Sequence, residues 1–244
     1  MTERKDQGSF KVSESDFQQA LSEKRGARGA LVGFAFAFAV SLLAGMTDAI
    51  GFLSAGDFIS FMSGNTTRFA IAFAEARYVD AARLAMILGV FVLGNALGAS
   101  IVHLAGYRIS PLLIFVGCLL AASGMLFHGA HMVFALVPAV LAMGALNSAV
   151  ESVAGHPVSL TYVTGALSRF GKGLGRLAVG KGDFTFLLHV VPWIGMLSGA
   201  IGGSFLQIEH PTISFYVPAG IAAFLAFIAF LLPTDFEKDY LGRV

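Results

Sequence analysis

Six long apolar stretches set the tightest limit on what this chain can fold into. They cover residues 30–53, 83–105, 110–128, 131–152, 184–206 and 212–232, and each holds few charges. About 20 apolar residues in a helix cross the roughly 30 Å hydrocarbon core of a bilayer. The 244-residue chain is 56% hydrophobic and 13% charged, with a mean hydropathy of +0.77, so it lacks the polar surface of a soluble globule. We therefore expect an all-α, polytopic membrane helix bundle of about six spans.

Basic residues indicate the orientation of such a bundle. If the N-terminus lies inside, thirteen of the 16 Lys and Arg residues fall in inside segments, and only Arg68, Arg77 and Arg83 fall outside. We expect polar cytoplasmic tails at residues 1–29 and 233–244. Residues 13–25 are expected to form a short amphipathic helix that begins at a Ser cap and lies on the membrane surface.

The two halves of the sequence repeat each other. The segment "AGDFISFMSGNTTRF" (55–69) corresponds to "AGHPVSLTYVTGALSRF" (154–170), and "LGNALGAS" (93–100) corresponds to "LSGAIGGS" (197–204). Both members of the first pair are apolar stretches broken by polar residues. Each repeat therefore reads as one span, a broken polar segment and two further spans.

This pattern predicts two membrane repeats, at residues 30–128 and 131–232. With three spans each, the repeats have inverted orientations, which is a recurrent plan of transporters. If the polar segments also crossed the membrane, there would be eight spans and parallel repeats, and both termini would still lie inside. We favour the inverted plan with broken or re-entrant segments, because 155–171 is short for a span.

The broken segments hold the residues that we expect to bind a solute. Small residues let a helix stop or restart in the membrane, and a helix N-terminus attracts an anion. Arg68 and Arg169 occupy equivalent places, and each costs about 2.5–3.5 kcal/mol at mid-bilayer. Their symmetry indicates an anion site; the alternative is that both reach the headgroups. The expected set is Ser63, Gly64, Asn65, Thr66, Thr67, Arg68, Tyr162, Thr164, Gly165 and Arg169.

Three further polar residues are candidates for coupling transport to an ion. Asp48 lies late in the first span, and Asn147 occupies the equivalent place in the second repeat. Glu151 follows Asn147 by four residues, so the two share a helix face. Carboxylates inside membranes often relay protons. The alternative is a carboxylate at the interface, or one paired statically with an arginine.

Other motifs favour packing rather than chemistry. Gly94 and Gly98, and Gly195, Gly199 and Gly203, are spaced for close helix contact, either within the chain or in a homo-oligomer. His128 and His131 have no acidic or cysteine companions, so we expect no metal site. The sequence contains no enzymatic signature, and we expect neither a catalytic residue nor a cofactor. A net charge of +1 argues against nucleic acid as a partner.

Two segments carry a family resemblance. "TDAIGFLSAGDFISFMSGNTT" (47–67) and "LNSAVESVAGHPVSLTYVTGAL" (146–167) resemble the YoaK family of uncharacterised bacterial multi-pass membrane proteins, over about residues 30–232. The resemblance implies a protein of the bacterial inner (plasma) membrane with about six helices. It supplies no substrate.

The residues themselves favour a secondary transporter or permease for a small anionic or polar solute. Its partners would be the lipid bilayer and that solute, with proton coupling through Asp48 and Glu151. A passive channel would have the same polar lining but would ignore the proton gradient. A sensor or assembly protein that transports nothing is the third alternative.

Overall fold

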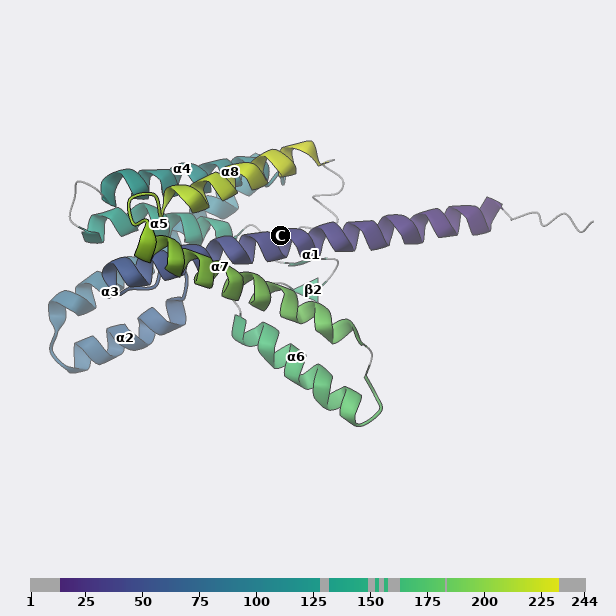
Figure 1. Ribbon diagram of the computed structural model, residues 1–244, viewed down its shortest axis with the longest axis horizontal. Helices are drawn as coiled ribbons and strands as arrows, with labels where there is room; N and C mark the ends of the chain where they lie inside the picture. Colours follow the sequence, from purple (N-terminus) through teal and green to yellow (C-terminus); the bar gives the residue numbers. More distant parts are fainter. Residues whose placement is uncertain are drawn as a thin grey trace, which may run out of the picture.

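A computed structural model describes residues 14–127, 132–148, 152–153, 156–157, 163–182 and 184–232. Within these residues the chain is almost entirely helical (Figure 1). The elements are α1 (Glu14–Ala55), α2 (Met62–Ala74), α3 (Tyr78–Leu104), α4 (Ser110–Phe127), α5 (Met132–Asn147), α6 (Val163–Ala178), the 3-10 helix η1 (Phe184–Val190), α7 (Val191–Glu209) and α8 (Tyr216–Leu231). A short antiparallel hairpin pairs β1 (Ser152–Val153) with β2 (His156–Pro157).

Each of the six predicted spans overlaps an apolar helix, although the fourth extends past the end of α5 and the fifth begins in η1. Among the described residues, four segments are long and apolar enough to cross a membrane: Leu31–Ala55, Tyr78–Leu104, Ser110–Phe127 and Phe186–Glu209. The apolar parts of α5 and α8 are shorter. The prediction of a polytopic, helical membrane bundle is therefore confirmed.

Helix α1 is the central element of the bundle (Figure 1). Its spanning part is 67% buried, whereas that of α3 is 22% buried and leaves most of its apolar surface for lipid. The expected separate helix at 13–25 is instead the start of α1, which continues unbroken from Glu14. Gly26 and Gly29 lie within it, and a single glycine costs only about 1 kcal/mol in a helix, which is too little to end one.

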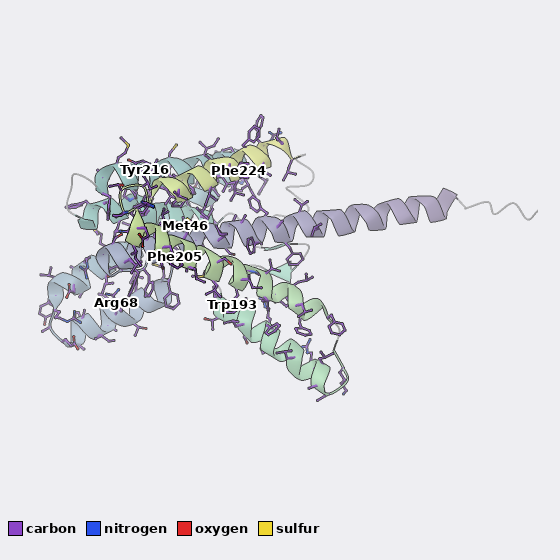
Figure 2. All side chains as sticks on the ribbon, in the orientation of Figure 1. Met46, Arg68, Trp193, Phe205, Tyr216 and Phe224 are labelled. Carbon is purple, nitrogen blue, oxygen red and sulfur yellow. The ribbon has the colours of Figure 1, made fainter. Side chains whose placement is uncertain are left out.

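Glycines bring α1 and α7 into close contact. A Cβ at Gly195 would overlap the carbonyl oxygen of Phe38, one at Gly199 that of Leu42, and one at Gly203 that of Met46. Met46 lies where the two helices cross in Figure 2. The paired residue numbers rise together, so α1 and α7 run parallel. Close approach of backbones through small residues is the usual basis of helix packing in membranes.

The same arrangement recurs between α3 and α5. A Cβ at Gly94 would meet the carbonyl oxygen of Leu141, and one at Gly98 that of Ala145, so these helices are also parallel. Both predicted glycine motifs therefore pack against helices of the same chain. A role for them in a homo-oligomer stays a prediction.

Helices α4 and α8 pack against each other in the opposite sense. A Cβ at Gly117 would lie 3.3 Å from the carbonyl oxygen of Ala219, and one at Gly124 would lie 3.0 Å from the ring of Tyr216. Because the number of one partner rises as the other falls, α4 and α8 are antiparallel.

The short helices α2 and α6 form two arms that diverge below the α1–α7 pair in Figure 1. Helix α2 is joined to the end of α1 by the loop at residues 56–61, and it packs against α3. Helix α6 packs against η1 and α7. Each arm thus begins near the centre of the molecule and ends at its periphery.

Candidate functional site

The loop between α1 and α2 is held by the carboxylate of Asp48. One oxygen of Asp48 accepts hydrogen bonds from the backbone N–H groups of Ile59 (2.7 Å) and Ser60 (2.6 Å). The other accepts the hydroxyl hydrogen bond of Ser60, at 2.6 Å. Asp48 and Ser60 are both buried. The loop therefore folds back beside the last two turns of α1.

Asn65 holds the same loop from the α2 side. Its side-chain amide donates to the carbonyl oxygen of Phe58 at 2.7 Å, and its own oxygen accepts from the N–H of Phe58 at 3.4 Å. Asn65 is fully buried. Non-helical backbone at membrane depth needs such partners, because lipid offers none. Asp48 and Asn65 thus explain why a polar segment can interrupt two apolar runs.

The neighbouring polar residues lie on α2 itself. The hydroxyls of Thr66 and Thr67 donate to the carbonyl oxygens of Met62 and Ser63, one helical turn earlier. Ser63, Thr66 and Thr67 are exposed, and Gly64 lies against the ring of Phe61. These interactions are local to α2.

Arg68 is engaged by a buried carboxylate that precedes it in the loop. Its guanidinium lies 3.0 Å from Asp57 Oδ1 and donates to the carbonyl oxygen of Gly56. Arg83 of α3 lies 3.1 Å from Asp57 Oδ2 and 3.5 Å from Asp80. Asp57 is 1% exposed. Two guanidinium groups therefore surround one buried carboxylate, and this cluster ties the loop to α2 and α3.

A pocket of about 520 Å³ lies between the first broken segment and the start of α6. Phe52, Phe58 and Phe61 form one wall, with ring centroids 4.7 Å apart for the stacked first pair and 5.2 Å apart for the edge-to-face second pair. Val163 and Thr164 of α6 also line it. The two broken segments thus face a common space.

Helices α1 and α7 complete this pocket, which we call the central pocket. Asp48 of α1 and Ser204 of α7 contribute its polar groups together with Thr164. Among the described residues that line it, none is Lys or Arg. Arg68 and Arg169 both lie outside it. Arg68 lies on the α2 arm, on the side of the molecule away from α6 (Figure 2).

The remaining predicted residues of the second repeat lie in different surroundings. Asn147 donates to the side-chain oxygen of Asn95 at 3.1 Å, which links α5 to α3. Gly165 is half-buried on α6, next to Thr164. Tyr162 and Glu151 lie outside the described residues.

Arg169 lines a second, smaller pocket of about 200 Å³ beside α6. Three other basic residues, Lys172, Arg176 and Lys181, line it as well. The two arginines that the sequence pairs by symmetry therefore lie in different surroundings: Arg68 contacts Asp57, and Arg169 lines this pocket.

Sequence reasoning missed two parts of this region. It did not single out Asp57 and Arg83. An acidic residue among apolar stretches that also contain an arginine is itself a sign of an ion pair, because charged residues within membrane segments usually pair with one another. Sequence reasoning also missed the aromatic wall, whose phenylalanines occur in the same segment as the polar residues. In the part of the chain that the structure describes, no three His, Cys, Asp or Glu residues lie together as a metal site would require.

Comparisons with known proteins give the chain a family context. A family model described as "Protein of unknown function (DUF1275)" matches residues 36–228. The chain is 44% identical over 215 residues to the UPF0700 transmembrane protein RA0705 of Rhizobium meliloti (strain 1021), with 88% of this chain and 93% of that protein covered. No solved structure matches.

Proposed function

The chain belongs to the DUF1275 family, whose members are integral membrane proteins of unknown function, and we propose that it is a secondary transporter or permease for a small polar solute. The observation that carries the proposal is the central pocket, which lies between the two broken segments with Asp48 on its wall. Its volume of about 520 Å³ is in the usual range for sites that bind small molecules. Sites of this kind in transporters lie near the bilayer midplane, where the repeats meet.

The helix pairings support two inverted repeats. Exchanging the halves replaces α1 by α5, α3 by α7 and α4 by α8. The parallel pair α1–α7 then becomes the parallel pair α5–α3, and the antiparallel pair α4–α8 is exchanged with itself. Eight alternating spans would make α4 and α8 parallel, so the observed directions favour six spans and the inverted plan.

The lining of the central pocket favours a polar solute over an anion. Asp48 is its one ionisable lining residue among those described, and a carboxylate repels an anion. Aromatic faces and hydroxyls at Thr164 and Ser204 suit a compact solute with both apolar and hydrogen-bonding groups. The arginines have no part in this site, although symmetry first indicated them as anion ligands.

Asp48 provides a route for coupling the site to protons. As a carboxylate it accepts three hydrogen bonds from the loop at Ile59 and Ser60. Protonation would remove the charge that strengthens these bonds and would loosen the loop. Because the loop carries Phe58 and Phe61, the aromatic wall would move with it. Proton binding and opening of the pocket are thereby linked.

Replacing Asp48 by Asn tests this coupling. The amide keeps the shape and can still accept the two backbone hydrogen bonds, but it cannot take up a proton. Uptake of a panel of radiolabelled small polar solutes into proteoliposomes should no longer respond to a proton gradient, while exchange without a gradient persists. Asp48→Ala, which removes the loop contacts, should lose both. Full gradient-driven uptake by Asp48→Asn would reject the coupling role.

Thiol labelling separates a carrier from a channel. Cys118, the chain's one cysteine, is exposed and would first be replaced by Ala. A cysteine in place of Ser204 then reports access to the central pocket. A carrier should let an impermeant maleimide reach it from one side at a time, with the side changing with pH. Equal labelling from both sides at every pH would point to a channel instead.

A further inference from the structure

The second pocket, beside α6, concentrates positive charge. Arg169, Lys172, Arg176 and Lys181 line its volume of about 200 Å³, together with His189 of η1. All of its lining residues belong to α6, to the turn after it and to η1, and none lines the central pocket. No carboxylate lines it among the described residues. We call it the basic pocket.

The regular spacing of α6 and the turn at its C-terminus bring these cations together. Arg169, Lys172 and Arg176 are spaced by three and four residues, so they share one face of α6. The helix ends at Ala178, and Gly180 two residues later has a left-handed φ of 70°. There the N–H of Gly180 donates to Leu177 O at 3.0 Å, and the N–H of Lys181 donates to Arg176 O at 2.9 Å. This Schellman motif turns the chain back and places Lys181 beside Arg176.

Helix η1 closes the pocket on the other side. Gly173 is buried, and a Cβ there would overlap the side chain of Phe186. The ring of Phe186 also lies against that of Phe170, with centroids 5.6 Å apart. This contact fixes η1 against α6, so that His189 of η1 reaches the basic face.

Large apolar side chains of α6 and η1 that do not line the basic pocket are exposed. Leu167, Leu174 and Leu177 of α6 are 41%, 46% and 36% exposed, and Phe184 of η1 is 69% exposed. Cations beside exposed leucine and phenylalanine are typical of an element that lies in the membrane interface, with its charges at the headgroups and its apolar face among the acyl chains. The charge distribution of the sequence predicts the cytoplasmic side for this element.

We propose that the basic pocket binds the phosphate group of an anionic phospholipid. Arginine and lysine supply the charge-assisted hydrogen bonds that phosphate oxygens accept. Basic pockets beside membrane helices on the cytoplasmic side are suited to anionic headgroups. The volume admits a phosphate group, and the exposed leucines of the same helix offer apolar surface to acyl chains. The basic pocket is independent of the solute site, so either could exist without the other.

Lipid binding to the full-length protein tests the proposal. Dissociation constants for phosphatidylglycerol and phosphatidylcholine would be measured by native mass spectrometry of the detergent-solubilised protein. Phosphatidylglycerol should bind more tightly than phosphatidylcholine. The double variant Lys172→Gln/Arg176→Gln should weaken phosphatidylglycerol binding on the order of tenfold or more, because each basic residue near a membrane surface contributes about 1 kcal/mol. Both residues are exposed, so the variant should keep the fold.

Matched controls identify the cause of any change. Lys172→Arg/Arg176→Lys keeps the charge and should keep the preference for phosphatidylglycerol, whereas Arg108→Gln removes an exposed cation elsewhere and should change nothing. Equal phosphatidylglycerol affinity in the native protein and the Gln double variant would overturn the proposal. Inorganic phosphate is the second probe. If it competes with phosphatidylglycerol at equal concentration, the site takes a soluble phosphate and the lipid assignment is wrong.

Discussion

The carboxylate of Asp57 lies in the protein interior between two guanidinium groups, at 3.0 Å from Arg68 and 3.1 Å from Arg83. Removing one member of a buried ion pair costs roughly 3–5 kcal/mol, because the remaining charge is left without a partner. The arginine side chains are 36% and 28% exposed, so water offsets part of that cost. At this position the charge is therefore structural.

We expect Asp57→Asn to lower the free energy of unfolding by about 2–3 kcal/mol, a value reduced from the fully buried case for the exposure of both arginines. Unfolding of the purified protein in mixed detergent micelles would measure the loss. Glu75→Gln is the control, because Glu75 pairs with Arg77 where both side chains are more than half exposed. Equal stability of the two variants would contradict a structural role for the Asp57 cluster.

A substitution at Ala76 is expected to raise the free energy of unfolding rather than lower it. Ala76 follows the C-cap of α2 and has a φ of 57°, in the left-handed region where an L-residue with a Cβ is strained. Ala76→Gly should raise the free energy of unfolding by about 1 kcal/mol, because glycine adopts this conformation without steric cost. Ala82→Gly, in the exposed interior of α3, should lower it by about as much. Thermal unfolding of both variants would show whether one is stabilised and the other destabilised relative to the native protein. A destabilised Ala76→Gly variant would refute the strain argument.

At the level of elements, the fit of α1 against α7 depends on the absence of side-chain atoms. A Cβ at Gly199 would overlap the Leu42 carbonyl, which is backbone and has no rotamer to move to. The helices would have to separate, and the contacts of Gly195 and Gly203 would loosen with them. Small size at these positions is thus a requirement of the whole helix pair.

Gly199→Ala should therefore lower the thermal stability of the protein clearly, by several degrees. Gly89→Ala in α3 is the matched control, since nothing lies within 4 Å of a Cβ at Gly89. That control should be neutral or slightly stabilising, because alanine is the better helix former. Melting temperatures measured in one detergent compare the two directly. A Gly199→Ala protein as stable as the control would mean that α1 and α7 pack less closely than described.

The elements also show what the sequence could and could not predict. The apolar windows and the glycine spacings are local patterns, so they located the six helices and the surfaces on which they pack. The path of the loop at residues 56–61 is set by Asp48, which binds the backbone of Ile59 and Ser60, eleven and twelve residues later in the sequence. A periodic pattern in the sequence cannot predict such a contact. Asp57 was missed for the same reason. The sequence therefore predicted Arg68 as an anion ligand, although its neighbour in the fold is the carboxylate of Asp57.

For the whole molecule, helix directions favour one of the two topologies that the charge count left open, and labelling can test that preference. In the inverted plan α2 and α6 do not cross the membrane, and the turns that follow them lie on opposite sides. In the eight-span plan both cross in the same direction, and both turns lie inside. Val79, just after the α2 turn, and Val179, at the end of α6, are exposed by 86% and 68% and would report these positions.

Single cysteines at Val79 and Val179, in a Cys118→Ala background, should label from opposite sides. An impermeant maleimide added to intact cells should reach Val79→Cys, which follows the outer turn, and should miss Val179→Cys until the cells are permeabilised. Both variants replace an exposed valine, so neither should disturb packing. The antiparallel contact of α4 with α8 gives the physical reason. If only α5 and α7 cross the membrane between them, α8 runs opposite to α4; if α6 also crosses, α8 runs parallel to α4. Labelling of both cysteines from one side would require parallel repeats, and α4 and α8 could then not pack as they do.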